Sequence, residues 1–267
     1  MNAAAMNSIV FAVGFVLLSW WFSTGLILVL NGLPRSTFPY SLGATSALAL
    51  SGLAALVLGS RSTTPAAAYV GFCGALAMWA WHELTFLLGI ITGPRKTPCP
   101  PDAQGWKRFR YATEVVIHHQ LALAGSVVLV VLLTWHQPNQ VGAQTLLVLW
   151  VMRLSAELNV FLGVRNLTEE FVPMRLRYML SYFRRRRLNA LMPLSVFAGS
   201  AAVIWLARQA AVAPAFMAIA QTLVAAILAL AVIEHIFLAL PVPDAVLWRW
   251  AVRLRRGRLP VAPTSAP

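Results

Sequence analysis

The chain has 267 residues, of which 59% are hydrophobic and 11% charged, and its formal net charge is +13. Soluble domains carry about 25% charged residues. That deficit and the mean hydropathy of +0.72 exclude an ordinary soluble protein and indicate a polytopic membrane protein. No feature is typical of a nucleic-acid-binding module, so we expect no nucleic-acid partner and attribute the basic residues to membrane topology and lipid contact.

Apolar stretches follow one another along the chain, and each is long enough to cross about 30 Å of hydrocarbon as a helix. They lack the alternation of barrel strands, and backbone groups in lipid must be satisfied within each segment. We therefore predict an all-α membrane bundle of seven transmembrane helices, at residues 8–30, 40–59, 66–91, 111–135, 141–163, 188–206 and 213–240. Residues 1–240 form one membrane domain, and residues 241–267 form a basic tail.

The basic residues predict the orientation of this bundle. With the N-terminus outside, 18 of the 21 Lys and Arg residues fall in cytoplasmic connections and in the cytoplasmic tail, whereas Arg61 and Arg208 fall outside. Cytoplasmic loops of membrane proteins carry such an excess. The remaining basic residue, Arg153, lies within the fifth predicted span.

Two cytoplasmic segments have the pattern of basic amphipathic helices. The apolar residues of segment 174–183 recur with helical spacing, at Leu176, Met179, Leu180 and Phe183. The tail repeats this pattern from Asp244 onward. We expect both segments to lie in the headgroup layer and to present arginines to anionic lipid or to a partner protein. These arginines are Arg184, Arg185, Arg186, Arg187, Arg249, Arg253 and Arg256.

Ionisable residues inside the predicted spans indicate where the chemistry lies. Each costs at least about 2.5–3.5 kcal/mol in hydrocarbon unless it is satisfied internally. At 1.5 Å per residue, the carboxylates of the third, fourth, fifth and seventh spans share one cytoplasm-side layer, about 6 to 12 Å deep. We predict a ligand or metal layer made of His82, Glu83, Glu114, His118, His119, Glu157, Glu234 and His235. Arg153 and Asn159 are supporting polar residues of this layer.

Spacing assigns helix faces but leaves three interpretations of the layer open. Glu114 and His118 share a face, as do Arg153 and Glu157, which can form an ion pair. One interpretation is a metal centre, possible at Glu83, Glu114, His118, Glu157 and Glu234. Another is a polar pocket for a pigment, a quinone or a lipid headgroup, with a histidine available as an axial ligand to a chlorin magnesium. The third is polar pairing that only fixes helix packing.

Six short stretches carry a further signal. They are Trp81-His82-Glu83, Thr92-Gly93-Pro94-Arg95 with Cys99-Pro100, His119, Trp150-Val151-Met152-Arg153-Leu154-Ser155-Ala156-Glu157-Leu158-Asn159, Asn166-Leu167-Thr168-Glu169-Glu170-Phe171 and Ser181-Tyr182-Phe183-Arg184-Arg185-Arg186. In these stretches the chain resembles the PuhE family of phototrophic bacteria, photosynthetic complex assembly protein 2. The resemblance is densest from Trp150 to Arg186.

The resemblance implies a multi-pass protein of the bacterial inner (intracytoplasmic) membrane, linked to the reaction-centre H-subunit gene cluster. Its role would be to assist or regulate the assembly of bacteriochlorophyll-containing photosynthetic complexes. The implied partners are reaction-centre or antenna subunits and other assembly factors, in addition to membrane lipids. The family offers no catalytic residues, so enzymatic activity stays open. The alternative function is a metal-dependent membrane oxidoreductase acting on a pigment or lipid, and the cofactor stays open between bacteriochlorophyll and a di-metal centre.

Overall fold

The computed structural model describes residues 3–167, 169, 172–240, 248 and 250–251, and this part of the chain is helical, with no named strand. The predicted all-α fold is confirmed. The long helices are α1 (Ala3–Asn31), α2 (Phe38–Gly59), α3 (Pro65–Leu87), α4 (Gly105–Leu133), α5 (Val141–Leu162), α6 (Leu191–Val212) and α7 (Ala215–Ala239). Two 3-10 helices, η1 (Arg35–Thr37) and η3 (Met174–Tyr182), lie in the connections.

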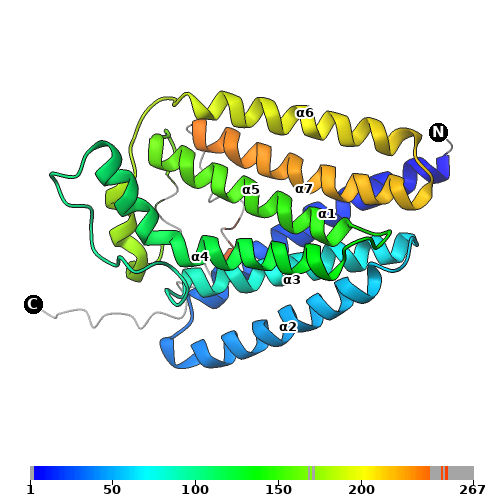
Figure 1. Ribbon diagram of the computed structural model, residues 1–267, viewed down its shortest axis with the longest axis horizontal. Coiled ribbons are helices and arrows are strands. Elements are labelled where there is room, and N and C mark those ends of the chain that lie inside the picture. Colours follow the sequence, from blue (N-terminus) through cyan, green and yellow to red (C-terminus); the bar gives the residue numbers. More distant parts are fainter. Residues whose placement is uncertain (1–2, 168, 170–171, 241–247, 249, 252–267) are drawn as a thin grey trace, which may run out of the picture.

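The helices form an elongated bundle with α2 and α6 at opposite edges (Figure 1). Helix α7 contacts α1, α3, α5 and α6, and α3 contacts α5 in turn. The main apolar core joins these helices through Val16 on α1, Phe72 on α3, Leu149 on α5 and Leu223 on α7. Polar side chains on the inner faces of α3 and α5 therefore lie in the middle of the bundle.

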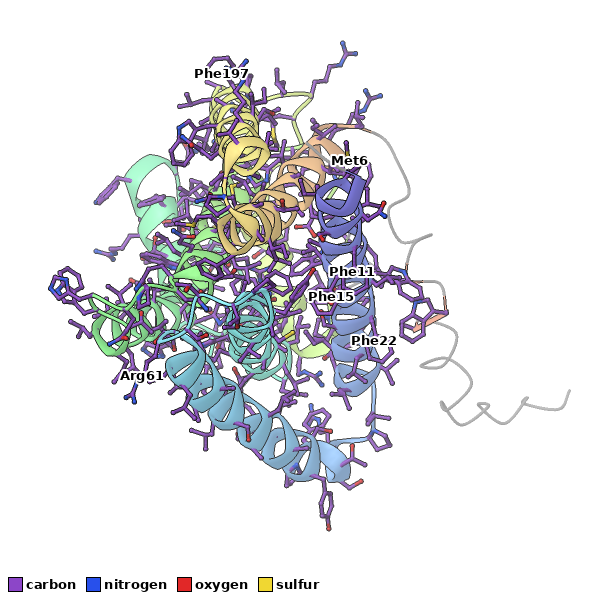
Figure 2. All side chains as sticks on the ribbon, turned by 90° about the vertical axis from the view of Figure 1, so that its right-hand side faces the viewer. Met6, Phe11, Phe15, Phe22, Arg61 and Phe197 are labelled. Atoms are coloured by element: carbon purple, nitrogen blue, oxygen red, sulfur yellow. The ribbon has the colours of Figure 1, made fainter. Side chains whose placement is uncertain are left out.

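Within the described residues, six helices are long and apolar enough to cross a membrane: α1, α2, α4, α5, α6 and α7. Their outer faces carry apolar side chains, as lipid-facing surfaces do: Phe11 and Phe22 on α1 and Phe197 on α6 are 65%, 58% and 74% exposed (Figure 2). Helix α3 has a comparable length of 23 residues but carries His82 and Glu83 and is covered by its neighbours. The structure thus supports a multi-pass membrane protein with six such helices, where the sequence predicted seven spans.

The connections between helices alternate between the two ends of the bundle. Residues 32–37 and 88–104 and the described residues of 163–190 lie at one end, named here the basic end because most of the basic connections gather there. Arg175 in η3 joins these connections, since its Nε donates to Leu87 O at 2.7 Å and its Nη2 donates to Asn31 O at 2.9 Å. At the opposite end, Asn139 Nδ2 donates to the backbone oxygen of Gly59 at 3.1 Å.

Helix α3 ends earlier than the predicted span, which ran to residue 91. It stops at Leu87 because Gly89, with a φ of +75°, reverses the chain two residues later. The backbone N–H of Ile90 then donates to Thr85 O at 3.0 Å, which satisfies a carbonyl in the last turn. Glu83 consequently lies in the last turn and a half of α3 rather than deep within a longer helix.

Helix α6 is shifted relative to its predicted span at residues 188–206. It begins at Leu191 because the side-chain oxygen of Asn189 accepts from the backbone N–H groups of Leu191 and Met192, at 2.9 and 3.1 Å. It continues to Val212, since nothing in the following Ala-rich residues breaks a helix. Helix α4 likewise starts at Gly105, before the predicted position 111.

The predicted amphipathic segment 174–183 is helical, but it forms the 3-10 helix η3 instead of an α-helix. Its buried residues Leu176, Met179 and Tyr182 recur every three positions, which is the period of a 3-10 helix. They pack in one cluster with Phe86 of α3 and Val115 of α4. The apolar face of η3 therefore covers the protein core at the basic end. The sequence had instead predicted that this face contacts lipid headgroups.

Candidate functional site

Arg153 on α5 is the central charge of the bundle interior. Its Nη1 lies 3.5 Å from Oε2 of Glu83 on α3, and its Nε lies 3.1 Å from Oε1 of Glu157 on α5. The three side chains are 29%, 12% and 22% exposed, so the charges are partly shielded from solvent. The ion pair expected between Arg153 and Glu157 from their four-residue spacing is confirmed.

Helix α4 adds an amide and an imidazole to these carboxylates. Gln120 Nε2 donates to Glu157 Oε2 at 2.9 Å, and Trp150 Nε1 donates to Gln120 Oε1 at 3.2 Å. His119 is fully buried, and its Nε2 lies 3.8 Å from Glu83 Oε1. These contacts join α3, α4 and α5. The residues are named together the Arg153 cluster: Glu83, His119, Gln120, Trp150, Arg153 and Glu157.

Gln120 and Trp150 were not among the predicted site residues. A signal for Gln120 was present in the sequence, because it directly follows His118 and His119 and so extends a polar run inside an apolar span. The role of Trp150 depends on the packing of α4 against α5, which spacing within α5 does not reveal.

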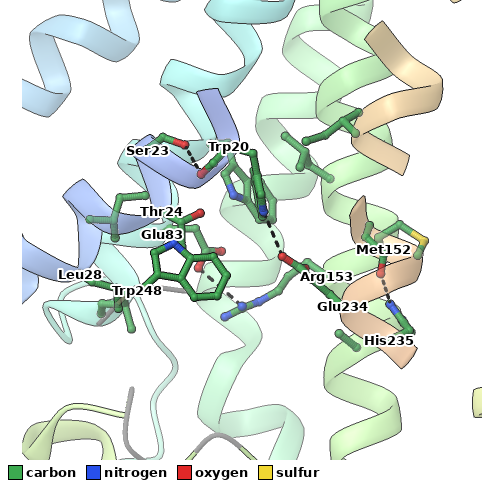
Figure 3. Close-up of a pocket in the computed structure, with 17 residues that line it drawn as sticks. Trp20, Ser23, Thr24, Leu28, Glu83, Met152, Arg153, Glu234, His235 and Trp248 are labelled. Carbon is green, nitrogen blue, oxygen red and sulfur yellow. Dashed lines mark hydrogen bonds and ion pairs between the residues drawn. The ribbon is translucent and has the colours of Figure 1, made fainter. Parts of the chain in front are cut away.

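A cavity of about 260 Å³ adjoins the Arg153 cluster, between α1, α3, α5 and α7. Glu83 and Arg153 line it together with Glu234 and His235 of α7, and most of its remaining lining is apolar (Figure 3). Trp20 of α1 directs its indole N–H at Glu234, with 3.1 Å between Nε1 and Oε1. Trp20 was not predicted as a site residue, because the first predicted span carries no ionisable group to draw attention to it.

His235 belongs to a second polar group that joins α5, α6 and α7. Its Nδ1 lies 2.8 Å from Ala231 O, and its Nε2 lies 3.0 Å from Ser155 Oγ. Because a carbonyl oxygen only accepts, the proton of a neutral His235 is on Nδ1. Asn159 joins this group through Nδ2, which lies 3.2 Å from Ser195 Oγ. The structure therefore places Asn159 beside Ser155 and Ser195. The sequence had instead predicted it as a supporting residue of the carboxylate layer.

His82 is buried but faces α4 and does not line the cavity. Its Nε2 lies 2.8 Å from Ser126 Oγ on α4. The adjacent residue Glu83 points into the Arg153 cluster. This divergence is the one expected for neighbouring residues on a helix, which point about 100° apart.

Glu114 and His118 lie away from the Arg153 cluster. Glu114 pairs with Arg95 Nε at 2.9 Å and with Arg110 Nε at 3.4 Å, toward the basic end. His118 is exposed, which corrects the expectation that it faces the interior. The reason is the rotation of α4, which turns His119 inward and thus turns the face shared by Glu114 and His118 outward.

The predicted metal residues are consequently not gathered at one centre. Among the described residues, no three His, Cys, Asp or Glu side chains lie close enough to hold one metal ion. Glu83 and Glu157 belong to the Arg153 cluster, and Glu234 lies in the cavity wall on α7. Glu114 and His118 lie on the outer face of α4.

The connection after α3 docks against the backbone of α4 beside the site. The N–H of His119 donates to Thr92 O at 2.9 Å, and the N–H of Arg95 donates to Glu114 O at 3.2 Å. Gly93 permits this approach, because a Cβ at that position would lie 2.1 Å from Glu114 O. The motif Thr92-Gly93-Pro94-Arg95 therefore fixes the position of α4 at the level of the Arg153 cluster.

The predicted basic surface is described only in part. Arg185 forms an ion pair with Glu169, and Val164 bonds to Arg184 O and to the N–H of Arg186. Arg185, Arg186 and Arg187 are exposed, as a lipid or partner surface requires. The predicted arginines of the tail, Arg249, Arg253 and Arg256, lie outside the described residues.

Comparisons with known proteins give the family of this chain. The family described as "Protein of unknown function (DUF3623)" matches residues 6–258. The chain is 34% identical over 238 residues to the "Uncharacterized 30.4 kDa protein in puhA 5'region" of Rhodobacter capsulatus, with 86% of each protein covered. No solved structure matches the chain.

Proposed function

The chain belongs to the DUF3623 family, and from this premise we propose that it is a membrane factor that assists or regulates the assembly of bacteriochlorophyll-containing photosynthetic complexes. The Rhodobacter capsulatus relative supports the proposal, because its name assigns it to the region 5' of puhA. The PuhE-like motifs imply the same setting. Reaction-centre or antenna subunits are the proposed partners, and a bacterial inner membrane is the proposed location.

The proposed topology has seven spans, with the N-terminus outside and the C-terminus in the cytoplasm. Helix α3, the third in chain order, is the span that raises the count from six to seven. It is as long as its neighbours, and its polar residues face other helices. Connections 32–37, 88–104 and 163–190 share one end of the bundle, as alternate crossings require. The excess of Lys and Arg at that end supports a cytoplasmic position for it.

The cavity beside the Arg153 cluster is the observation that supports ligand binding as part of the proposed function. Polar groups that only fix packing are normally hydrogen-bonded. Here Glu83 Oε1 and both ring nitrogens of His119 are buried, and within the described residues they make no hydrogen bond. Glu83 also lines the cavity. We assign the cavity to a ligand because Glu83, which lines it, has a buried carboxylate oxygen that makes no hydrogen bond within the described residues.

The size of the cavity limits what it can enclose. Pockets for drug-sized ligands measure about 300–1,000 Å³, and this cavity measures about 260 Å³. His235 Nε2 already lies 3.0 Å from Ser155 Oγ, so this nitrogen is engaged within the protein and is not offered to a pigment magnesium. The cavity suits the polar end of an amphiphile, such as a quinone ring, a lipid headgroup or a pigment substituent. Its apolar remainder would contact Trp20, Trp79 and Leu149.

Complementation tests the proposed function. In a Rhodobacter capsulatus strain lacking the 34% identical relative, we expect weaker near-infrared absorption of the photosynthetic complexes in isolated membranes. This chain should restore the absorption. The Glu234→Gln and Arg153→Met variants should restore less per molecule of accumulated protein, whereas Asp102→Asn, which changes the exposed ion pair with Lys107, should restore fully. Normal absorption in the strain lacking the relative would contradict the proposal.

A further inference from the structure

The cavity beside the Arg153 cluster combines charged groups with aromatic and apolar groups in its wall. Glu83 of α3 and Arg153 of α5 supply a carboxylate and a guanidinium. Trp20 of α1, Trp79 of α3 and Met152 of α5 line the same space (Figure 3). Indole rings and a thioether make favourable contacts with a flat aromatic ring. The wall therefore suits a planar ring that also carries polar substituents.

The positive charge of Arg153 is engaged by carboxylates of the protein. Its Nε lies 3.1 Å from Glu157 Oε1, and its Nη1 lies 3.5 Å from Glu83 Oε2. An anionic ligand would have to compete with both carboxylates, and a cationic ligand would lie beside the guanidinium. Arg153 is also about 14 Å from the end of α5 at Leu162, where a charged headgroup would lose its hydration. These contacts favour an uncharged ligand over a phospholipid headgroup.

Glu83 requires a hydrogen-bond donor from the ligand. Its two carboxylate oxygens lie 3.5 Å from Arg153 Nη1 and 3.8 Å from His119 Nε2. Both distances exceed the roughly 2.7–2.9 Å of a charge-assisted hydrogen bond. Within the described residues Oε1 makes no hydrogen bond, whereas an ionised carboxylate has sites for about four donors. A hydroxyl group in the cavity would supply a donor to this carboxylate.

We propose that the cavity binds the ring of a membrane hydroquinone, the reduced form of a quinone. Such a molecule is uncharged and flat, and it carries hydroxyl donors on an apolar skeleton. One hydroxyl donates to Glu83, while Trp20 and Trp79 contact the ring. Aliphatic side chains such as Leu149 contact its apolar substituents. This inference rests on the ligand-binding role proposed above for the cavity, and it names the class of ligand.

Binding to the purified full-length protein in detergent tests this assignment. The protein is titrated under anaerobic conditions with reduced decyl-ubiquinone, with its oxidised form, with decanol and with phosphatidylethanolamine, and binding is measured by calorimetry. The variant Ala156→Leu fills part of the cavity and keeps every polar group. The matched control Ala47→Leu makes the same change at an exposed position of α2. A third variant, Glu83→Gln, keeps the size of the side chain and removes its charge. Melting curves show which variants are folded.

The wild type and Ala47→Leu should bind one molecule of the reduced form and prefer it to the other three ligands. Ala156→Leu should bind it at least about tenfold more weakly, because the added side chain overpacks the cavity. Glu83→Gln should weaken the reduced form about fivefold and leave the oxidised form unchanged, because an amide is a weaker acceptor than a carboxylate and only the reduced form donates.

Three results would overturn the assignment. Equal affinities of Ala156→Leu and Ala47→Leu would exclude the cavity as the site. Decanol or the phospholipid binding as tightly as the reduced quinone would exclude recognition of the ring. Equal losses of both quinone forms in Glu83→Gln would exclude donation by a ligand hydroxyl.

Complementation separates this inference from the assembly function. Ala156→Leu that no longer binds the hydroquinone but restores near-infrared absorption fully would exclude a role of the hydroquinone in assembly. Normal absorption in the strain lacking the relative, together with hydroquinone binding by the purified protein, would contradict the assembly function and support the ligand.

Discussion

The guanidinium of Arg153 on α5 lies 3.5 Å from the carboxylate of Glu83 on α3, which joins two helices across the bundle interior. We expect Arg153→Met to lower the free energy of unfolding by about 3–5 kcal/mol, because it leaves the shielded carboxylates of Glu83 and Glu157 without their cation. Thermal or denaturant unfolding of the purified protein in detergent measures this loss.

The double variant Arg153→Met/Glu83→Gln serves as the control for this prediction. It removes one of the two carboxylate charges that the single variant leaves without their cation, while Glu157 stays charged, so it should recover part of the lost stability. Lys107→Met removes one partner of the exposed pair with Asp102 and should leave the melting temperature unchanged. A double variant no more stable than Arg153→Met would show that the ion pair is not what the single substitution breaks.

Much of the fold follows from sequence, because each apolar run must form its own hydrogen bonds in lipid and therefore becomes a helix. The helix ends were less predictable, since they depend on local groups such as Gly89 after α3 and Asn189 before α6. For η3, Leu176 and Met179 fit both an α-helical and a 3-10 period. Only packing against Phe86 and the residues around it distinguishes the two.

The site was predictable within helices but not between them. Spacing alone gives the pairing of Arg153 with Glu157. It does not show which of His118 and His119 faces inward, because that depends on how α4 is rotated against α3 and α5. The contact of Trp20 with Glu234 joins residues 214 positions apart, and no local pattern reports it.

Gly74 on α3 lies at a close approach of α2 and α3. A Cβ at Gly74 would lie 2.4 Å from the backbone oxygen of Gly52, which cannot rotate away as a side chain can. Gly74→Ala should therefore push the helices apart and destabilise the protein by about 1–3 kcal/mol. Gly43→Ala on α2 is the control, because a Cβ there meets nothing within 4 Å. Melting curves of the two variants should differ, and coincident curves would argue against this helix contact.

Cysteine accessibility tests whether α3 spans the membrane. In a variant without Cys73 and Cys99, single cysteines at Ser62 and Thr97 lie in the connections before and after α3. An impermeant maleimide added to intact cells should label Ser62→Cys, and it should label Thr97→Cys only after the membrane is opened. Labelling of both from the same side would mean that α3 does not cross, and the orientation of the following helices would have to be reversed.

His118 and His119 are adjacent on α4 but differ in environment, which makes them a matched pair. His119 is fully buried in the Arg153 cluster, 3.8 Å from Glu83, whereas His118 is exposed. We expect His119→Ala to lower the free energy of unfolding by about 1–3 kcal/mol and His118→Ala to change it by less than about 0.5 kcal/mol.

Their effect on function separates a binding role of the cluster from a packing role. If the cluster binds a ligand, His119→Ala should restore less near-infrared absorption than the wild type at equal amounts of accumulated protein, because a buried polar group facing Glu83 is lost. If the cluster only fixes packing, absorption per molecule should equal that of the wild type once growth at lower temperature brings the protein to normal levels. His118→Ala should match the wild type in both cases, and a defect there would place the functional face of α4 on its outer side.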